Sequence, residues 1–208
     1  MSDTKERILQ AALTLFAQDG YRAVSVSAIA GKLGITKGAL YKHYENKQAI
    51  FNSIVERMVQ EDARQAQAYE MPEQLYEEAP AAYAKTTIEH IKAFTLAQFS
   101  YWTANPFASR FRKMLTLEQY RDPEMAALYQ NCLTAGPVAY MEDIFRELMR
   151  CKVIHPGDPK ALALAYFAPM ALLIQMSDHA EDCSEFEPLL CRLIDQFMVT
   201  VQVKEEVQ

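Results

Sequence analysis

The fold is decided by the stretch SVSAIAGKLGITKGALYKHY, which runs from Ser25 to Tyr44. Its pattern predicts two short helices joined by a tight turn at Gly34, the geometry of a helix-turn-helix. The apolar positions that would hold both helices against an earlier helix are Ile29, Ala30, Leu33, Ile35, Leu40 and Tyr44. The other side of the second helix carries Thr36, Lys37, Gly38, Tyr41, Lys42 and His43. This polar side offers hydroxyl and ammonium groups to phosphate oxygens and base edges, with Gly38 permitting close approach, which indicates a site for double-stranded DNA.

Helices are also predicted on both sides of this stretch. An apolar face at helical spacing predicts a first helix over about residues 4–19, and Gly20 stands where a left-handed residue ends a helix. Ser25 precedes the second helix, and Asn46 is the expected N-cap of a fourth helix that continues to about Tyr69. The first four helix starts therefore fall within about fifty residues.

The rest of the chain shows helical periodicity and almost no strand alternation. We expect helices over about residues 81–104, 106–117, 123–151, 159–178 and 185–203, with prolines in several first turns. The prediction is an all-α chain in two domains. Residues 1–48 form a three-helix helix-turn-helix domain, and residues 49–208 form a larger helical domain for effector binding and dimerisation.

The charge distribution supports a nucleic-acid partner although the formal net charge is −6. The stretch from Tyr21 to Ile50 has an excess of four positive charges, because its only carboxylate, Glu45, faces five cations. These cations are Arg22, Lys32, Lys37, Lys42 and Lys47. The remaining sequence carries the acidity.

Other classes of protein find little support. The N-terminus shows no secretory signal, and the apolar run Ala161–Ile174 is shorter than a bilayer crossing needs, so we expect a buried helix in a cytoplasmic protein without a membrane partner. Cys132, Cys151, Cys183 and Cys191 are widely separated, which predicts free thiols. The four histidines are also far apart, and no nucleophile, phosphate-loop or metal-site motif is present. We therefore expect neither an enzyme nor a cofactor or metal.

The stretch from Gly20 through Lys47 resembles the DNA-binding signature of the TetR family of bacterial repressors. The residues that carry the resemblance are Gly20-Tyr21, Ser25, Ile29-Ala30, Gly34-Ile35-Thr36, Lys37-Gly38, Leu40-Tyr41, His43-Tyr44 and Lys47. The resemblance implies that Lys37, Gly38 and Leu40 approach bases, whereas Ser25, Thr36, Tyr41 and Lys47 bind phosphates. His43 is a further candidate, which either faces DNA or packs against the first helix. Departures from the family pattern are Gly31, Ala39 and Tyr44, none of which alters the turn.

The role of the larger domain follows from the resemblance and from its amphipathic helices. Family members dimerise and hold an effector through this part, and the last two helices carry apolar stripes that suit a two-fold interface. Among many aromatic residues, the pocket candidates are Trp102, Phe111, Tyr140 and Phe167. The leading hypothesis is a homodimeric repressor that a small, mostly apolar ligand releases from its DNA operator. The alternative is a DNA-binding dimer whose C-terminal half docks a protein partner.

Overall fold

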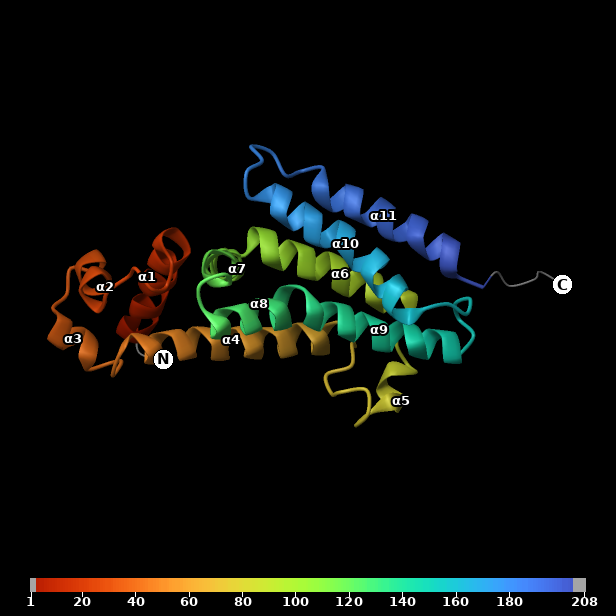
Figure 1. Ribbon diagram of the computed structural model, residues 1–208, viewed down its shortest axis with the longest axis horizontal. Helices are drawn as coiled ribbons and strands as arrows, with labels where there is room; N and C mark the ends of the chain where they lie inside the picture. The colour runs from red at the N-terminus through yellow and green to blue at the C-terminus, as the bar shows by residue number, and fades with distance from the viewer. Residues whose placement is uncertain (1–2, 204–208) are drawn as a thin grey trace. The chain divides into compact units, whose positions relative to one another are not determined.

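The computed structural model describes residues 3–203, and their regular structure is helical apart from one isolated bridge between Ile154 and Gln202. The helices are α1 (Asp3–Asp19), α2 (Val26–Lys32), α3 (Lys37–Tyr41), α4 (Lys47–Ala68), α5 (Pro80–Tyr83), α6 (Ile88–Ala104), α7 (Pro106–Glu118), α8 (Pro123–Leu133), α9 (Ala135–Arg150), α10 (Pro159–Ser177) and α11 (Phe186–Val201) (Figure 1). The predicted all-α class is confirmed.

The helices pack into two compact units that are not continuous in sequence. The first unit comprises the residues up to Asp62 together with Ala104–Gln130, and the second comprises Ala63–Thr103 together with the residues from Asn131 onward. This grouping differs from the predicted division after residue 48, because α7 packs closely against α1 although about ninety residues separate them (Figure 1). Helix α4 passes from the first unit into the second.

The core of the first unit is built on α1, whose buried residues are Ile8, Leu9, Ala11, Ala12, Leu13 and Phe16. Helix α7 buries Phe107, Phe111 and Leu115, among others. The guanidinium of Arg57 on α4 lies 4.4 Å from the Phe107 ring centroid and also forms an ion pair of 2.5 Å with Glu6 on α1. The first unit therefore joins helices from three distant parts of the sequence.

In the second unit, α10 packs along α9 and α11 (Figure 1). Tyr166 on α10 is buried between Phe145 and Phe197, at ring-centroid distances of 5.6 and 5.4 Å. Its hydroxyl is 2.8 Å from the Thr95 hydroxyl of α6, so the phenol is hydrogen-bonded inside the core. Burial raises the pKa of Tyr166 further above its ordinary value.

Two long helices predicted from the sequence are interrupted. The predicted helix over residues 123–151 divides at Thr134, since Pro137 has no N–H to donate to the preceding turn. The predicted helix over residues 81–104 divides into α5 and α6, with residues 84–87 between them. Periodicity was present across both interruptions and so did not reveal them.

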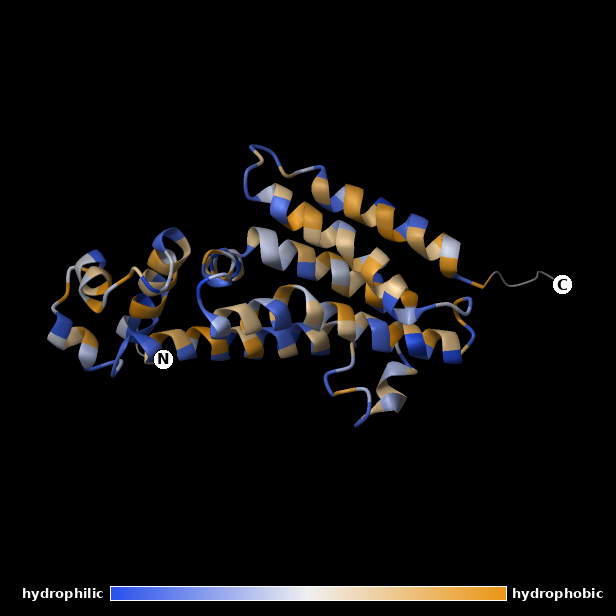
Figure 2. Cartoon of the chain, in the orientation of Figure 1, coloured by the Kyte–Doolittle hydropathy of each residue, from blue (hydrophilic) through white to orange (hydrophobic). Residues whose placement is uncertain are grey.

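Helix α10 has enough length and hydropathy to cross a membrane by those two measures alone. It buries Ala163, Tyr166, Met170, Leu173 and Ile174 within the second unit. Leu164, Leu172 and Met176 are exposed in the single chain. Hydrophobic residues recur along both α10 and α11 (Figure 2). The expected buried helix is thus only partly covered by its own chain.

Candidate nucleic-acid interface

Two side-chain caps shape the helix-turn-helix. Ser25 has an extended backbone, and its Oγ accepts the Ala28 N–H at 3.1 Å to begin α2. Thr36 begins α3 in the same way, with its Oγ1 accepting the Ala39 N–H at 3.1 Å. Gly34 between the helices has a φ of +65°, where glycine has no steric penalty. The turn predicted from the sequence therefore has a physical basis at each of its positions.

The apolar side of the helix-turn-helix packs into the first unit. Ile29 and Ala30 of α2 are buried, as are Leu40 of α3 and Tyr44 just after it. Leu33 and Ile35 at the turn are half-buried. This packing orients α3 and determines which of its side chains solvent can reach.

The exposed side of α3 and its N-cap carries Thr36, Lys37, Gly38, Tyr41 and Lys42, which we call the reading face. Tyr41 keeps 49% of its surface exposed although it is aromatic. Ser25 is exposed as well, whereas His43 is half-buried. The hydroxyls of Ser25 and Thr36 use an oxygen lone pair in capping, and each retains an O–H that can be donated to a phosphate. Two ammonium groups and three hydroxyls are therefore available on one surface.

Leu40 corrects one role implied by the resemblance. Its exposed fraction is 0%, because its side chain packs beneath α3. In this arrangement the side chain is not accessible to a base edge, which differs from the expectation that Leu40 approaches a base. The apolar periodicity had also placed Leu40 in the core, and that prediction is confirmed.

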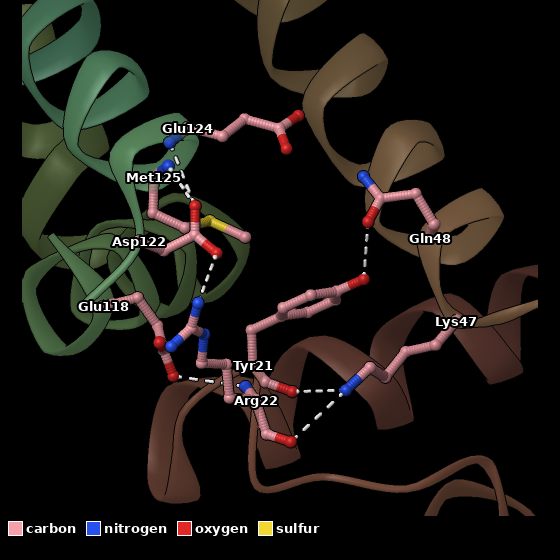
Figure 3. Close-up of polar contacts among 8 residues, drawn as sticks. All are labelled: Tyr21, Arg22, Lys47, Gln48, Glu118, Asp122, Glu124 and Met125. Carbon is pink, nitrogen blue, oxygen red and sulfur yellow. Dashed lines mark hydrogen bonds and ion pairs between the residues drawn. The ribbon is translucent and has the colours of Figure 1, made fainter.

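Lys47 also lies differently from the expected phosphate contact. Its ammonium donates to the backbone carbonyl oxygens of Tyr21 at 2.8 Å, Val24 at 2.9 Å and Arg22 at 3.4 Å. The Nζ atom also lies 4.3 Å from the centroid of the Tyr21 ring. Burial lowers the pKa of Lys47, and the negative charge of Glu118 partly opposes this shift. The three N–H donors of Lys47 are thus directed at the chain itself, and Figure 3 shows the contacts with Tyr21 and Arg22.

The connection between α1 and α2 has further partners that the sequence did not reveal. Glu118 Oε1 accepts the Arg22 N–H at 3.2 Å, and the Arg22 guanidinium lies 3.6 Å from the Asp122 carboxylate. The Tyr21 hydroxyl donates to Gln48 Oε1 at 2.7 Å (Figure 3). Glu118 and Asp122 are about a hundred residues away from this connection in the sequence, and no local pattern marks them.

The four pocket candidates do not all belong to the same unit. Phe111 is fully buried in the first unit, whereas Trp102, Tyr140 and Phe167 belong to the second. Tyr140 is half-buried, and its hydroxyl donates to the Pro72 carbonyl at 2.8 Å. Its ring lies 6.1 Å from that of Tyr83 and 6.4 Å from that of Phe94. Of the four candidates, Tyr140 lies within a larger aromatic cluster of the second unit.

Solved structures with this fold are all-helical bacterial regulators. SmeT, described as the repressor of a multidrug efflux pump of Stenotrophomonas maltophilia, aligns with a TM-score of 0.65 and 19% identity over 100% of this chain and 94% of the other. A tetR-family regulatory protein from Rhodococcus RHA1 aligns with a TM-score of 0.67 and 21% identity over 99% of this chain and 100% of the other. At these identities the likeness concerns the fold.

Sequence similarity is concentrated at the N-terminus. YerO of Bacillus subtilis, an uncharacterised HTH-type transcriptional regulator, is 41% identical over 56 residues, which are 27% of this chain and 19% of that protein. The HTH-type transcriptional regulator AcrR of Shigella flexneri is 41% identical over 54 residues, which are 26% of this chain and 25% of that protein. The matched segment thus spans a quarter or less of these relatives, whose names are those of transcriptional regulators.

The similarity coincides with the module described above. Residues 8–54 match the family described as "Bacterial regulatory proteins, tetR family". They comprise most of α1, all of α2 and α3, and the first turns of α4. Residues 8–54 therefore carry the helix-turn-helix of the tetR family of bacterial regulatory proteins, and the fold of the chain resembles that of a solved tetR-family protein.

Proposed function

We propose that this chain is a DNA-binding transcriptional repressor that acts as a homodimer and leaves its operator when it binds a small, mostly apolar molecule. The observation that carries the proposal is the reading face. Lys37 and Lys42 are exposed beside a buried Leu40 on a helix that two side-chain caps and a tight turn hold in place. A short helix presented in this way fits the major groove of B-form DNA.

Each residue of the reading face has a role that suits its chemistry. Lys37 lies in the first turn of α3, the part of a recognition helix that approaches base edges. Gly38 lets the backbone come close, and a Cβ there would meet no atom nearer than 3.9 Å, so its role is toward the DNA rather than toward the core. Ser25, Thr36 and Tyr41 would donate to phosphate oxygens. His43 is half-buried and would reach the edge of this surface.

The dimer would form through α10 and α11. Leu172 on α10 keeps 58% of its surface exposed, and Leu164, Met176 and Val199 are exposed as well. Removing such apolar side chains from water stabilises association by about 25 cal/mol for each Å² buried. A second copy of the chain would cover them through an isologous interface, and a two-fold dimer would place two reading faces on successive major grooves.

Support for an effector site comes from polar atoms in the second unit that lack a partner. Gln65 Oε1, Thr86 Oγ1 and His90 Nδ1 are buried, and no hydrogen-bond partner for them exists among residues 3–203. Each is three or four residues from an aromatic side chain of one cluster, formed by Tyr69, Tyr83, Phe94 and Tyr140, whose neighbouring rings lie 6.1 to 6.4 Å apart. Aromatic walls with a few unpaired polar atoms suit a small aromatic ligand with hydrogen-bonding groups.

The names of similar proteins agree with this proposal. One neighbour was solved as a SmeT–triclosan complex, and another is described as a flavonoid-responsive regulator. One relative is named as a transcriptional repressor and another as a probable operon repressor. A ligand can release this chain from DNA only if it favours a conformation that does not fit the operator. Its affinity for that conformation must exceed its affinity for the DNA-binding conformation. Helix α4 provides a continuous covalent connection between the two units.

A second function is favoured by the same apolar surface. The exposed side chains of α10 and α11 could dock a different protein, in which case no small molecule would be needed. The response to small molecules distinguishes the two, because a DNA-binding dimer whose C-terminal half docks a protein partner would keep the same operator affinity with every compound tested.

The proposal is tested by measuring fluorescence anisotropy of a labelled duplex that carries the DNA flanking the chain's own gene. We expect a saturable complex of two chains per duplex. Unlabelled, unrelated DNA of equal length should displace the labelled duplex only poorly. Addition of planar aromatic compounds, one at a time, should weaken the complex for at least one of them. Equal affinity of the chain for the flanking-DNA duplex and for random genomic duplexes would contradict the proposal.

A further inference from the structure

A single peptide group in the first unit lies between two opposite charges. The carbonyl of the Tyr21–Arg22 peptide accepts a hydrogen bond from the Lys47 ammonium at 2.8 Å, and its N–H donates to Glu118 Oε1 at 3.2 Å (Figure 3). Lys47 is the first residue of α4, and Glu118 is the last residue of α7. The connection between α1 and α2 is therefore attached at one point to both of these helices.

The charges reinforce each other through the peptide. A cation at the carbonyl and an anion at the N–H both favour the same orientation of the peptide dipole, and hydrogen bonds to charged groups are stronger than those between neutral groups. The effect is larger where water is excluded. Glu118 is only 1% exposed, and its second oxygen, Oε2, has no partner within residues 3–203, so the carboxylate is placed for this contact.

Glu118 also limits what residue 20 can be. A Cβ atom at position 20 would stand 2.4 Å from Glu118 Oε1, and the φ of Gly20 is +85°. Next to this contact, Arg22 and Asp122 form a second link of 3.6 Å, in which Arg22 is largely exposed. The buried contact of Glu118 and the exposed contact of Asp122 thus join the same connection to α7 and to the N-terminus of α8.

From these contacts we infer that Lys47 and Glu118 form a coupled pair of positioning residues, which orient the α1–α2 connection, and with it α2 and the reading face, for binding to DNA. The inference rests on the proposed function. It replaces the expected phosphate contact of Lys47 with an internal role and gives Glu118, which touches no DNA, a share in operator affinity.

A double-mutant cycle tests this pair in the full-length chain. The variants are Lys47→Met, Glu118→Ala and the combination of both, titrated against the flanking-DNA duplex that the unaltered chain binds. We expect each single variant to bind about tenfold more weakly, since each loses a charged hydrogen bond, and the double variant to bind no more weakly than the worse single variant. Glu118→Gln should restore binding to within about threefold of the unaltered chain, because its amide oxygen can accept the Arg22 N–H.

The salt dependence separates this role from a phosphate contact. If Lys47 works inside the chain, Lys47→Met should leave the slope of log affinity against log salt unchanged. A slope reduced by about one, as a lost phosphate contact gives, would overturn the inference. Losses that multiply to about a hundredfold in the double variant would also overturn it.

Asp122→Asn provides the matched control. It removes one negative charge, retains an oxygen that accepts the Glu124 N–H, and loses the ion pair with the largely exposed Arg22 side chain. We expect less than a twofold change in affinity, since such pairs contribute little.

Urea unfolding of every variant shows whether Lys47 and Glu118 are also coupled in stability. A failure of the unaltered chain to bind any flanking duplex would count against the proposed function. Coupling absent from both DNA binding and unfolding would count against the pair.

Discussion

Gly20 and Glu118 approach so closely that a methyl group on residue 20 would stand 2.4 Å from the Glu118 carboxylate oxygen. We expect Gly20→Ala to lower the free energy of unfolding by about 1–3 kcal/mol, because it adds this overlap to a residue that must keep a positive φ. Urea denaturation measures the change. Gly31→Ala is the control: it lies in α2, and its Cβ would meet nothing within 4 Å. Alanine there should stabilise the chain by about 0.5–1 kcal/mol. Equal effects at the two sites would contradict the structure.

Lys37 should contribute to sequence preference as well as to affinity. Lys37→Ala removes an ammonium from the first turn of α3, so operator binding should weaken by about 1–3 kcal/mol and the preference over random DNA should fall. Competition titrations against both duplexes provide the measurement. Lys32→Ala, an exposed lysine at the end of α2, should affect operator and random DNA alike. If the two variants were indistinguishable, α3 would not be the reading helix.

Leu40 should affect folding rather than base preference. Leu40→Ala leaves a cavity beneath α3, and we expect the free energy of unfolding to fall by about 2–5 kcal/mol. The variant that remains folded should keep the same preference among operator sequences. Leu117→Ala, at a partly exposed position of α7, should cost much less. A changed base preference in Leu40→Ala, without lost stability, would restore the role that the resemblance implied.

Leu172 should be necessary for the dimer. Leu172→Glu places a charge in the exposed apolar surface of α10, and sedimentation equilibrium should then show a monomer with weakened operator binding. Val59→Glu, at an exposed position of α4, should leave the oligomeric state unchanged. A dimer that persists in Leu172→Glu would locate the interface elsewhere.

Tyr83 predicts a loss of stability in alkaline solution. Burial raises its pKa to about 12, with the charges of Asp143 and Glu77 acting in the same direction. Because the unfolded phenol ionises near its usual pKa of about 10, stability is fully present below that pH and falls between about pH 10 and 12. Denaturant titrations across this range measure the effect. Tyr83→Phe should show a shallower decrease, with any remaining fall due to other buried tyrosines such as Tyr166.

Local signals explain which elements could be predicted. The cap at Ser25, the glycine at position 34 and the apolar face of α1 each depend on residues a few positions apart, and each was found where expected. The interruption at Thr134 was missed because the apolar pattern continues across it.

The residues of the candidate site also fall into those that the sequence pattern placed correctly and those that it did not. Lys37, Gly38 and Tyr41 are exposed as the polar pattern indicated, whereas the roles of Leu40 and Lys47 came from the resemblance and differ in the structure. The partners of Lys47 are carbonyl groups, which any sequence would supply. Glu118 lies 96 residues from Arg22, so its contact depends on tertiary packing that no short motif records.

The grouping of α7 and α8 with the first three helices bears on how this protein could be engineered. A chimera that exchanges only residues 1–48 with a relative would leave Glu118 and Asp122 behind and place a foreign α1–α2 connection against them. The transplantable unit for DNA recognition instead includes Ala104–Gln130, so specificity grafts between regulators of this kind should transfer two separate segments of sequence together.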